Sequence, residues 1–110
     1  MCRQPGPARL RLAATAQDRY TGPWNRPTAS TILVIGNTTD PFLPLRDDIA
    51  MTRQLGNARL LVVHGYGHTA FLNPSTCAAT YMTAYFQTGA LPPKGTVCRQ
   101  NQPPFLPPAG

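Results

Sequence analysis

Two side chains in this sequence could form a catalytic pair of an acid and a base. Asp40 follows the apolar run "VIG" and the polar residues "NTT", and His68 follows a second apolar run in the segment "VVHGYGH". A carboxylate beside a histidine accepts a hydrogen bond from the imidazole Nδ1–H and fixes the tautomer. It also stabilises the imidazolium that forms when Nε2 takes a proton from a nucleophile. The two residues therefore indicate general-base chemistry at a nucleophilic site.

Each of these residues also has an ordinary structural interpretation. Asp40 precedes Pro41 and could close a turn by accepting hydrogen bonds from the backbone that follows. His68 could be a loop histidine bonded to the backbone, and this is the favoured interpretation of His64. A metal site made of His64, Asp40 and His68 is disfavoured, because the histidines do not share a helical face and no further carboxylate or thiolate completes a usual ligand set. No cofactor is expected.

The segments that position Asp40 and His68 predict a βαβ unit. "STILVIGN" is an apolar, β-rich run without alternation, which is typical of a strand buried on both faces of a parallel sheet. The segment from about 45 to 55 has acidic residues near its start and is followed by Gly56, which indicates a helix. "NARLLVV" predicts a second strand that ends at Val63. Because parallel strands present their carboxyl ends at one sheet edge, Asp40 and His68 are expected to meet there.

The rest of the chain is predicted to form a loop, a helix and a tail. "HGYGHTAF" indicates a loop, because its two glycines oppose both regular structures. A helix is expected with Asn73 as N-cap, Pro74 at its first position and Gly89 closing it. Apolar pairs four residues apart predict one packed stripe on this helix. The stripe consists of Cys77, Ala78, Tyr81, Met82, Tyr85 and Phe86. From Leu91 onward, the proline-rich sequence predicts an extended tail.

Composition allows one modest domain and disfavours some partners. The chain has 110 residues, of which 42% are hydrophobic and 13% charged, with its 13 prolines gathered near both ends. The net charge of +6 comes mainly from scattered arginines without interleaved aromatic residues, which disfavours a nucleic-acid partner. No stretch approaches the roughly 20 apolar residues of a membrane span, and no apolar signal segment follows the basic start. Secretion would require a signal upstream of Met1.

The predicted sheet is incomplete. Two strands that are apolar on both faces need neighbouring strands and covering helices, but only two strands and two helices are predicted. An isolated two-stranded sheet is marginally stable in water. We therefore expect the chain either to work as part of something larger or to fold poorly alone.

Four motifs, "YTGPWN", "VIGNTTDP", "QLGNARLLVV" and "GYGHT", together resemble the C-terminal domain of the tripeptidyl-aminopeptidase-like (TAP-like) α/β-hydrolases. The resemblance covers residues 20–98, which leaves 1–19 as a poorly ordered lead-in and 99–110 as a proline-rich tail. It implies an α/β fold, the C-terminal βαβα portion of an α/β-hydrolase with an incomplete parallel sheet. It also implies a secreted serine peptidase, often one that releases short N-terminal peptides, with Asp40 as the triad acid and His68 as the triad base.

The sequence departs from the family pattern at the nucleophile. An α/β-hydrolase presents its serine in a G-x-S-x-G turn between a strand and a helix. The only serines here are Ser30 in "TASTI" and Ser75 in "NPSTC", and neither has that setting. We therefore expect this chain to be inactive alone and to need the N-terminal catalytic portion of a hydrolase, whose substrate would be a peptide. The alternative is a non-catalytic interaction module that completes its sheet with a partner chain.

The cysteines are interpreted with the same resemblance. Cys77 and Cys98 resemble the cysteine pair that follows the histidine in many of these secreted hydrolases, and the chain between them is long enough to close a disulfide. The alternative is a pair of buried free thiols. Cys2 is left over, and either it pairs with an upstream cysteine in a longer protein or its place reflects where this chain begins.

Overall fold

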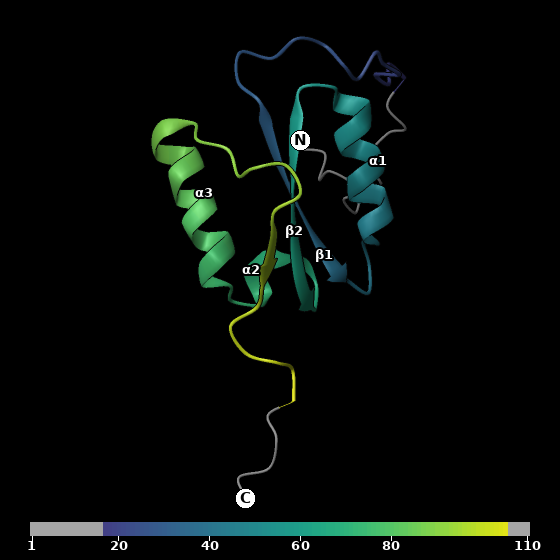
Figure 1. The fold of residues 1–110 in the computed structure, drawn as a ribbon. Helices are drawn as coiled ribbons and strands as arrows, with labels where there is room; N and C mark the ends of the chain where they lie inside the picture. The colour runs from purple at the N-terminus through teal and green to yellow at the C-terminus, as the bar shows by residue number, and fades with distance from the viewer. Residues whose placement is uncertain (1–16, 106–110) are drawn as a thin grey trace, which may run out of the picture.

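The computed structural model describes residues 17–105 and contains the predicted βαβ unit (Figure 1). Strand β1 covers Ile32–Thr39, helix α1 covers Leu45–Leu55 and strand β2 covers Ala58–Tyr66. The two strands are parallel, so the crossover through α1 brings both carboxyl ends to one edge of the sheet. Helix α1 follows the predicted bounds, and Gly56 comes after it with a φ of 75°, a conformation that favours glycine. Most of the expected lead-in, including Cys2, lies outside the described residues.

The glycine-rich segment "HGYGHTAF" is not the loop that the sequence predicts. Strand β2 continues through it to Tyr66, and a one-turn helix, α2, covers Thr69–Leu72. The neighbouring strand keeps the segment extended, since Thr39 of β1 pairs with Tyr66. Pairing between distant segments outweighs the weak strand preference of glycine here, and only the turn at Gly67 and His68 stays irregular.

Helix α3 covers Thr76–Thr88 and ends at Gly89, as predicted. Its N-terminus differs from the prediction. The capping side chain is Ser75, which accepts a hydrogen bond at 3.2 Å from the N–H three residues further on. Pro74 therefore precedes the cap instead of opening the helix. Asn73 and Ser75 are both good capping residues, so the choice between them depends on backbone angles that the local sequence does not fix.

A third strand lies in the proline-rich tail, where the sequence predicts only an extended chain. Strand β3 covers Val97–Arg99 and pairs in parallel with β2, which gives the sheet order β1-β2-β3. The expectation of only two strands is therefore wrong. Three residues are too few to show a periodic pattern, and β3 depends on partners far away in the chain. These partners are the backbone of β2 and the helix α3, to which Cys98 is joined by a disulfide.

The main core lies between the sheet and α3. Leu61 and Val63 of β2, Cys98 of β3 and Ala78 of α3 are buried together. Figure 1 shows α3 on this side of the sheet and α1 on the other. Both faces of β2 are therefore covered, as its continuous apolar sequence requires. None of the helices within residues 17–105 has the length and apolar character needed to cross a membrane.

The aromatic stripe predicted for α3 is only partly packed. Tyr81 lies against the core, and the Tyr85 hydroxyl donates a hydrogen bond of 2.7 Å to the Thr31 carbonyl. Phe86 is 79% exposed, so its predicted packing is wrong within this chain. The exposed ring lines a pocket together with Leu33 and Ile35 of β1.

Helix α1 approaches the other face of β1 at Gly36. A Cβ at that position would lie 2.6 Å from Asp48 Oδ2 and 2.8 Å from Leu45 Cδ1, so only glycine leaves room for the helix. Because α1 lies directly on the end of β1, the short connection between them is held in place. That connection carries Asp40.

The disulfide between Cys77 and Cys98 closes a sequence separation of 21 residues. Restricting an unfolded chain over a loop of this length stabilises the folded state by about 3 kcal/mol. We expect reduction to lower the free energy of unfolding by about that amount, as measured by urea denaturation with and without reductant. The double variant Cys77→Ala with Cys98→Ala is the control, because its stability should not respond to reductant. Alkylation of both cysteines before reduction, detected by intact mass, would contradict the bridge.

Candidate catalytic site

Asp40 lies directly after β1 and accepts hydrogen bonds from three backbone N–H groups. Its Oδ1 accepts from Phe42 at 2.8 Å and from Leu43 at 3.0 Å, which forms the turn that the structural interpretation predicts. Its Oδ2 accepts from the N–H of Thr69 at 2.9 Å. The side chain is only 3% exposed. One carboxylate therefore shapes its own loop and also binds the loop that follows β2.

The carboxyl of Asp40 is held in its ionised form. Burial raises its pKa, but the three backbone N–H groups, followed by the imidazole of His68, outweigh burial and hold the pKa well below its usual range. The charge affects a neighbour on α1. Burial first, and then the charges of Asp40 and Asp47, raise the pKa of the Asp48 carboxyl. The site thus keeps a fixed negative charge at the edge of the sheet.

His68 lies beside this charge, as the sequence predicts. Its Nδ1 is 3.1 Å from Oδ1 and 3.2 Å from Oδ2 of Asp40. An ionised carboxylate can only accept, so Nδ1 carries the proton and donates it, which leaves Nε2 as the basic nitrogen. The imidazole is 39% exposed, and the ring of Phe42 meets it edge-on with the centroids 5.3 Å apart. This arrangement can hold a neutral imidazole with Nε2 available to take a proton.

The backbone on both sides of His68 has unusual angles. Gly67 has a φ of 112°, and an added Cβ there would collide with the Asn73 amide. Thr69 has a φ of 61°, which is an outlier for a β-branched residue and is common at functional sites. The Thr69 N–H donates to the Asp40 carboxylate. Sequence reasoning did not identify Thr69, and no local signal marks it.

His64 is not part of the pair. Its Nδ1 lies 3.2 Å from the Thr38 hydroxyl. The favoured interpretation was a histidine bonded to the backbone, and it is wrong because the bonded group is a side chain. Thr38 and His64 lie side by side on the parallel strands β1 and β2, so the hydroxyl is within reach of the imidazole. Within residues 17–105, no three His, Cys, Asp or Glu side chains come close enough to hold a metal ion.

Neither serine of the sequence faces His68. Ser75 is buried at the start of α3, where its hydroxyl donates to the Arg99 carbonyl at 2.7 Å. Ser30 precedes β1 and so lies at the amino end of the strand, opposite to the edge that carries the Asp40–His68 pair. Within residues 17–105, no serine hydroxyl therefore lies beside the Asp40–His68 pair.

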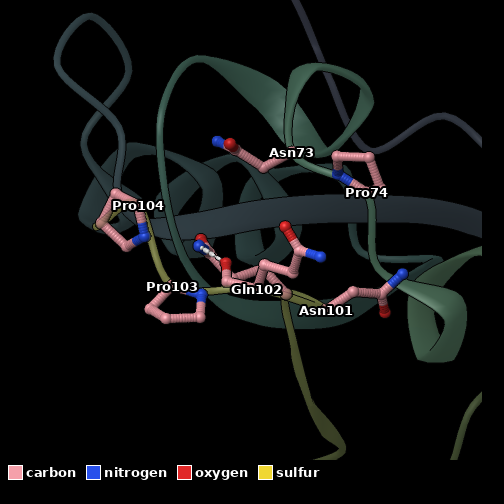
Figure 2. A pocket seen from close by; sticks show the side chains of 7 residues that line it. Asn73, Pro74, Asn101, Gln102, Pro103 and Pro104 are labelled. Atoms are coloured by element: carbon pink, nitrogen blue, oxygen red, sulfur yellow. Dashed lines mark hydrogen bonds between the residues drawn. The ribbon is translucent and has the colours of Figure 1, made fainter. Parts of the chain in front are cut away.

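A separate pocket lies between the α2–α3 connection and the segment that follows β3. Figure 2 shows it, with Asn73 and Pro74 on one side and Asn101, Gln102 and two prolines on the other. Its lining consists of amide and proline side chains, none of which titrates near neutral pH. The pocket is therefore unsuited to acid–base chemistry and is not a continuation of the Asp40–His68 pair.

The fold and the family match identify the class of protein. Three parallel strands in an open sheet, with helices on both faces, form part of an α/β-hydrolase fold. The sequence matches the family model described as TAP-like protein, an α/β-hydrolase family, over residues 12–98. The chain belongs to this family.

Individual relatives carry the name serine protease Hip1. Proteins with this name from Mycobacterium bovis and from two strains of Mycobacterium tuberculosis are 33% identical to the chain over 66 residues. The match covers 60% of this chain but only 12% of each relative, so the chain corresponds to a small part of their length. No solved structure matches the chain.

The low pKa of Asp40 predicts how stability depends on pH. A carboxyl whose pKa is lower in the folded state than in the unfolded state stabilises the fold above the unfolded pKa, about 3.9, and loses that contribution as the pH falls through the folded pKa. We expect the free energy of unfolding to fall from about pH 4 downward, and to fall less in Asp40→Asn. Denaturant titrations from pH 7 to pH 2 measure both slopes.

The matched control for this titration is Asp18→Asn, because Asp18 is exposed and shifts the pKa of neither Asp40 nor Asp48. Its pH profile should follow that of the unmodified chain. Equal slopes for Asp40→Asn and the unmodified chain would show that the carboxylate is not held as described.

Proposed function

We propose that this chain supplies the acid and the base of a Ser-Asp-His triad in a secreted serine hydrolase that cleaves peptides. The observation that carries the proposal is the pairing of His68 Nδ1 with the buried carboxylate of Asp40 at the carboxyl edge of a parallel sheet. Membership of the TAP-like family and the name serine protease of the Hip1 relatives support it. The disulfide supports an oxidising compartment.

In this proposal, each residue has one role in acyl transfer. A serine from another part of the enzyme attacks the acyl carbon while His68 Nε2 takes its proton. The imidazolium then gives that proton to the leaving amine, and a second cycle with water releases the acyl group. Asp40 remains ionised throughout, holds the Nδ1–H tautomer and stabilises the imidazolium.

The nucleophile and its oxyanion hole would come from polypeptide that continues the sheet beyond β1. Within residues 17–105, β1 has a neighbour on one side only, and its sequence ILVIGNTT contains no charge and no proline to block further pairing. Beside this free edge lies an apolar groove, lined by Leu33, Ile35, Ala70, Phe71, Met82 and Phe86 among others. The N-terminal catalytic portion of a hydrolase would fill both the edge and the groove.

We expect the purified 110-residue chain to release no amine from peptidyl substrates. To test the triad, the matching segment of Mycobacterium tuberculosis Hip1 is replaced by that of this chain, and peptide hydrolysis is measured in the chimera. His68→Ala should lower kcat by roughly 10⁴-fold or more, and Asp40→Asn by roughly 10⁴-fold, because the base and its orientation are lost. His64→Ala is the control and should retain most of the activity, since its ring bonds the Thr38 hydroxyl and makes no hydrogen bond to Asp40 or His68 within residues 17–105.

Two results would overturn the triad assignment. One is hydrolysis by the isolated chain that disappears on changing His68 to alanine. The other is an active chimera whose rate is the same with and without His68. The first would mean that the chain carries its own nucleophile, and the second would place the catalytic base somewhere else.

A second candidate function is a non-catalytic interaction module. The observation that favours it is the same uncovered surface, in which Phe86 and Phe71 are each 79% exposed. Phe86→Ser should leave the stability of the isolated chain unchanged, because the ring is exposed there, but should weaken assembly with a co-expressed hydrolase portion. Phe105→Ser, in the tail, is the matched control. Co-purification measures assembly, and a well-ordered monomer that no partner binds would contradict the module.

A further inference from the structure

Asn37 is a buried amide in a strand that is otherwise apolar in its interior. The whole residue is 3% exposed. Ser75 and the carboxylate of Asp40 are also buried, but each has an evident use, since Ser75 caps α3 and Asp40 binds the segments that follow β1 and β2. Asn37 lies on β1, where Leu33 and Ile35 pack against the core from the same face. An apolar residue would satisfy packing at this position.

The amide is only half satisfied, so its burial disfavours folding. Nδ2 donates a hydrogen bond of 3.1 Å to the Gly67 carbonyl. Oδ1 is buried and has no hydrogen-bond partner within residues 17–105. A buried acceptor without a partner destabilises a protein at least as much as one neutral hydrogen bond stabilises it. Stability therefore does not explain why position 37 is an asparagine. The contact that the amide makes with Gly67 can explain it.

That contact falls on the peptide unit that leads into His68. The Gly67 N–H donates to the Thr39 carbonyl at 3.1 Å, and the Gly67 carbonyl accepts from Asn37. The peptide group is planar, so fixing the Gly67 carbonyl also fixes the direction in which the chain enters His68. Gly67 is therefore held at both its N–H and its carbonyl, immediately before the candidate base.

The strand register shows why a side chain, and not the backbone, binds the Gly67 carbonyl. Asn37 pairs with Val63, but Thr39 pairs with Tyr66, so β2 contains an extra residue opposite the end of β1. The regular ladder is interrupted there, and the backbone of β1 cannot by itself bind every group of the turn. The Asn37 amide reaches across the interruption and binds the Gly67 carbonyl.

We propose that Asn37 is a positioning residue for His68, which it orients through the Gly67 carbonyl so that Nδ1 meets Asp40 and Nε2 stays free. This inference rests on the proposed function, because it concerns the same base. Asn37 touches neither the imidazole nor any reacting atom, and it acts only by fixing the Gly67–His68 peptide. Gly67 and Thr69, with φ of 112° and 61°, would otherwise allow the turn to relax to commoner angles.

The test is the variant Asn37→Leu, which removes both the donor and the unpaired acceptor while keeping a similar volume. If the Asn37 amide were purely structural, the variant would be less stable. If the amide positions His68, the variant should be as stable or more stable, because the unpaired acceptor is gone, but the geometry of His68 should be lost. Nitrogen-15 NMR of the His68 imidazole in the full chain reports the geometry. We expect the single Nδ1–H tautomer of the unmodified chain to become a mixture of both tautomers.

The matched control is Thr38→Val on the adjacent residue. It removes a hydroxyl that bonds the Gly65 N–H and lies against His64, but it does not touch Gly67. The His68 tautomer should be the same as in the unmodified chain. Retention of the single tautomer in Asn37→Leu, with the backbone resonances of α3 unchanged, would overturn the inference.

If Asn37→Leu fails to fold, two measurements replace it. Asn37→Asp keeps the shape but cannot donate to the carbonyl when ionised, and it should produce the same mixture of tautomers. In the unmodified chain, one Asn37 side-chain amide proton should exchange with solvent more slowly than those of Asn25 and Asn101, which are exposed. Fast exchange of that proton would overturn the inference. These readouts do not depend on activity, so a failed triad test and a failed positioning test remain distinct.

Discussion

The carboxylate of Asp40 is the interaction on which the rest of the site depends. It accepts hydrogen bonds from the loop that follows β1, from the loop that follows β2 and from the imidazole of His68. A buried charge is tolerated only when such partners surround it, so the same bonds that keep it ionised also hold the two loops together. The carboxylate thus stabilises the two loops and orients the histidine, and removing its charge would release both loops as well as the histidine.

The sequence predicted the framework well because its signals were local and repeated. A continuous apolar run, acidic residues in the first helical turn and a following glycine were enough to identify β1, α1 and β2, and the parallel arrangement placed Asp40 beside His68. The two interpretations of Asp40, a turn residue and the partner of His68, do not exclude each other. Its two carboxylate oxygens bind the backbone of the turn and the imidazole at the same time, which is why each interpretation had support.

The parts that escaped prediction depend on contacts between distant residues. The extension of β2 through two glycines needs β1 opposite, and β3 needs both β2 and the disulfide to α3. Thr69, whose φ is 61°, donates a hydrogen bond to Asp40, which lies 29 residues earlier in the sequence, and no neighbouring residue indicates this contact. Asn37 begins the polar run "NTT" at the end of β1, so its sequence did not mark it as buried, and its partner at Gly67 could not be read from sequence spacing.

The parallel sheet also has a consequence for how this chain reaches its folded state. Neither strand pair within residues 17–105 is a hairpin, since Ile32 pairs with Ala58 and Val62 pairs with Val97. Each pairing must wait until a long intervening segment has been made and brought back, which slows folding relative to proteins rich in local contacts. During synthesis, β1 leaves the ribosome well before β2, and for that interval this uncharged apolar strand lacks its β2 partner. Chaperones or an already folded neighbouring segment would shorten the exposure, so the order of synthesis matters to this fold as much as the contacts themselves.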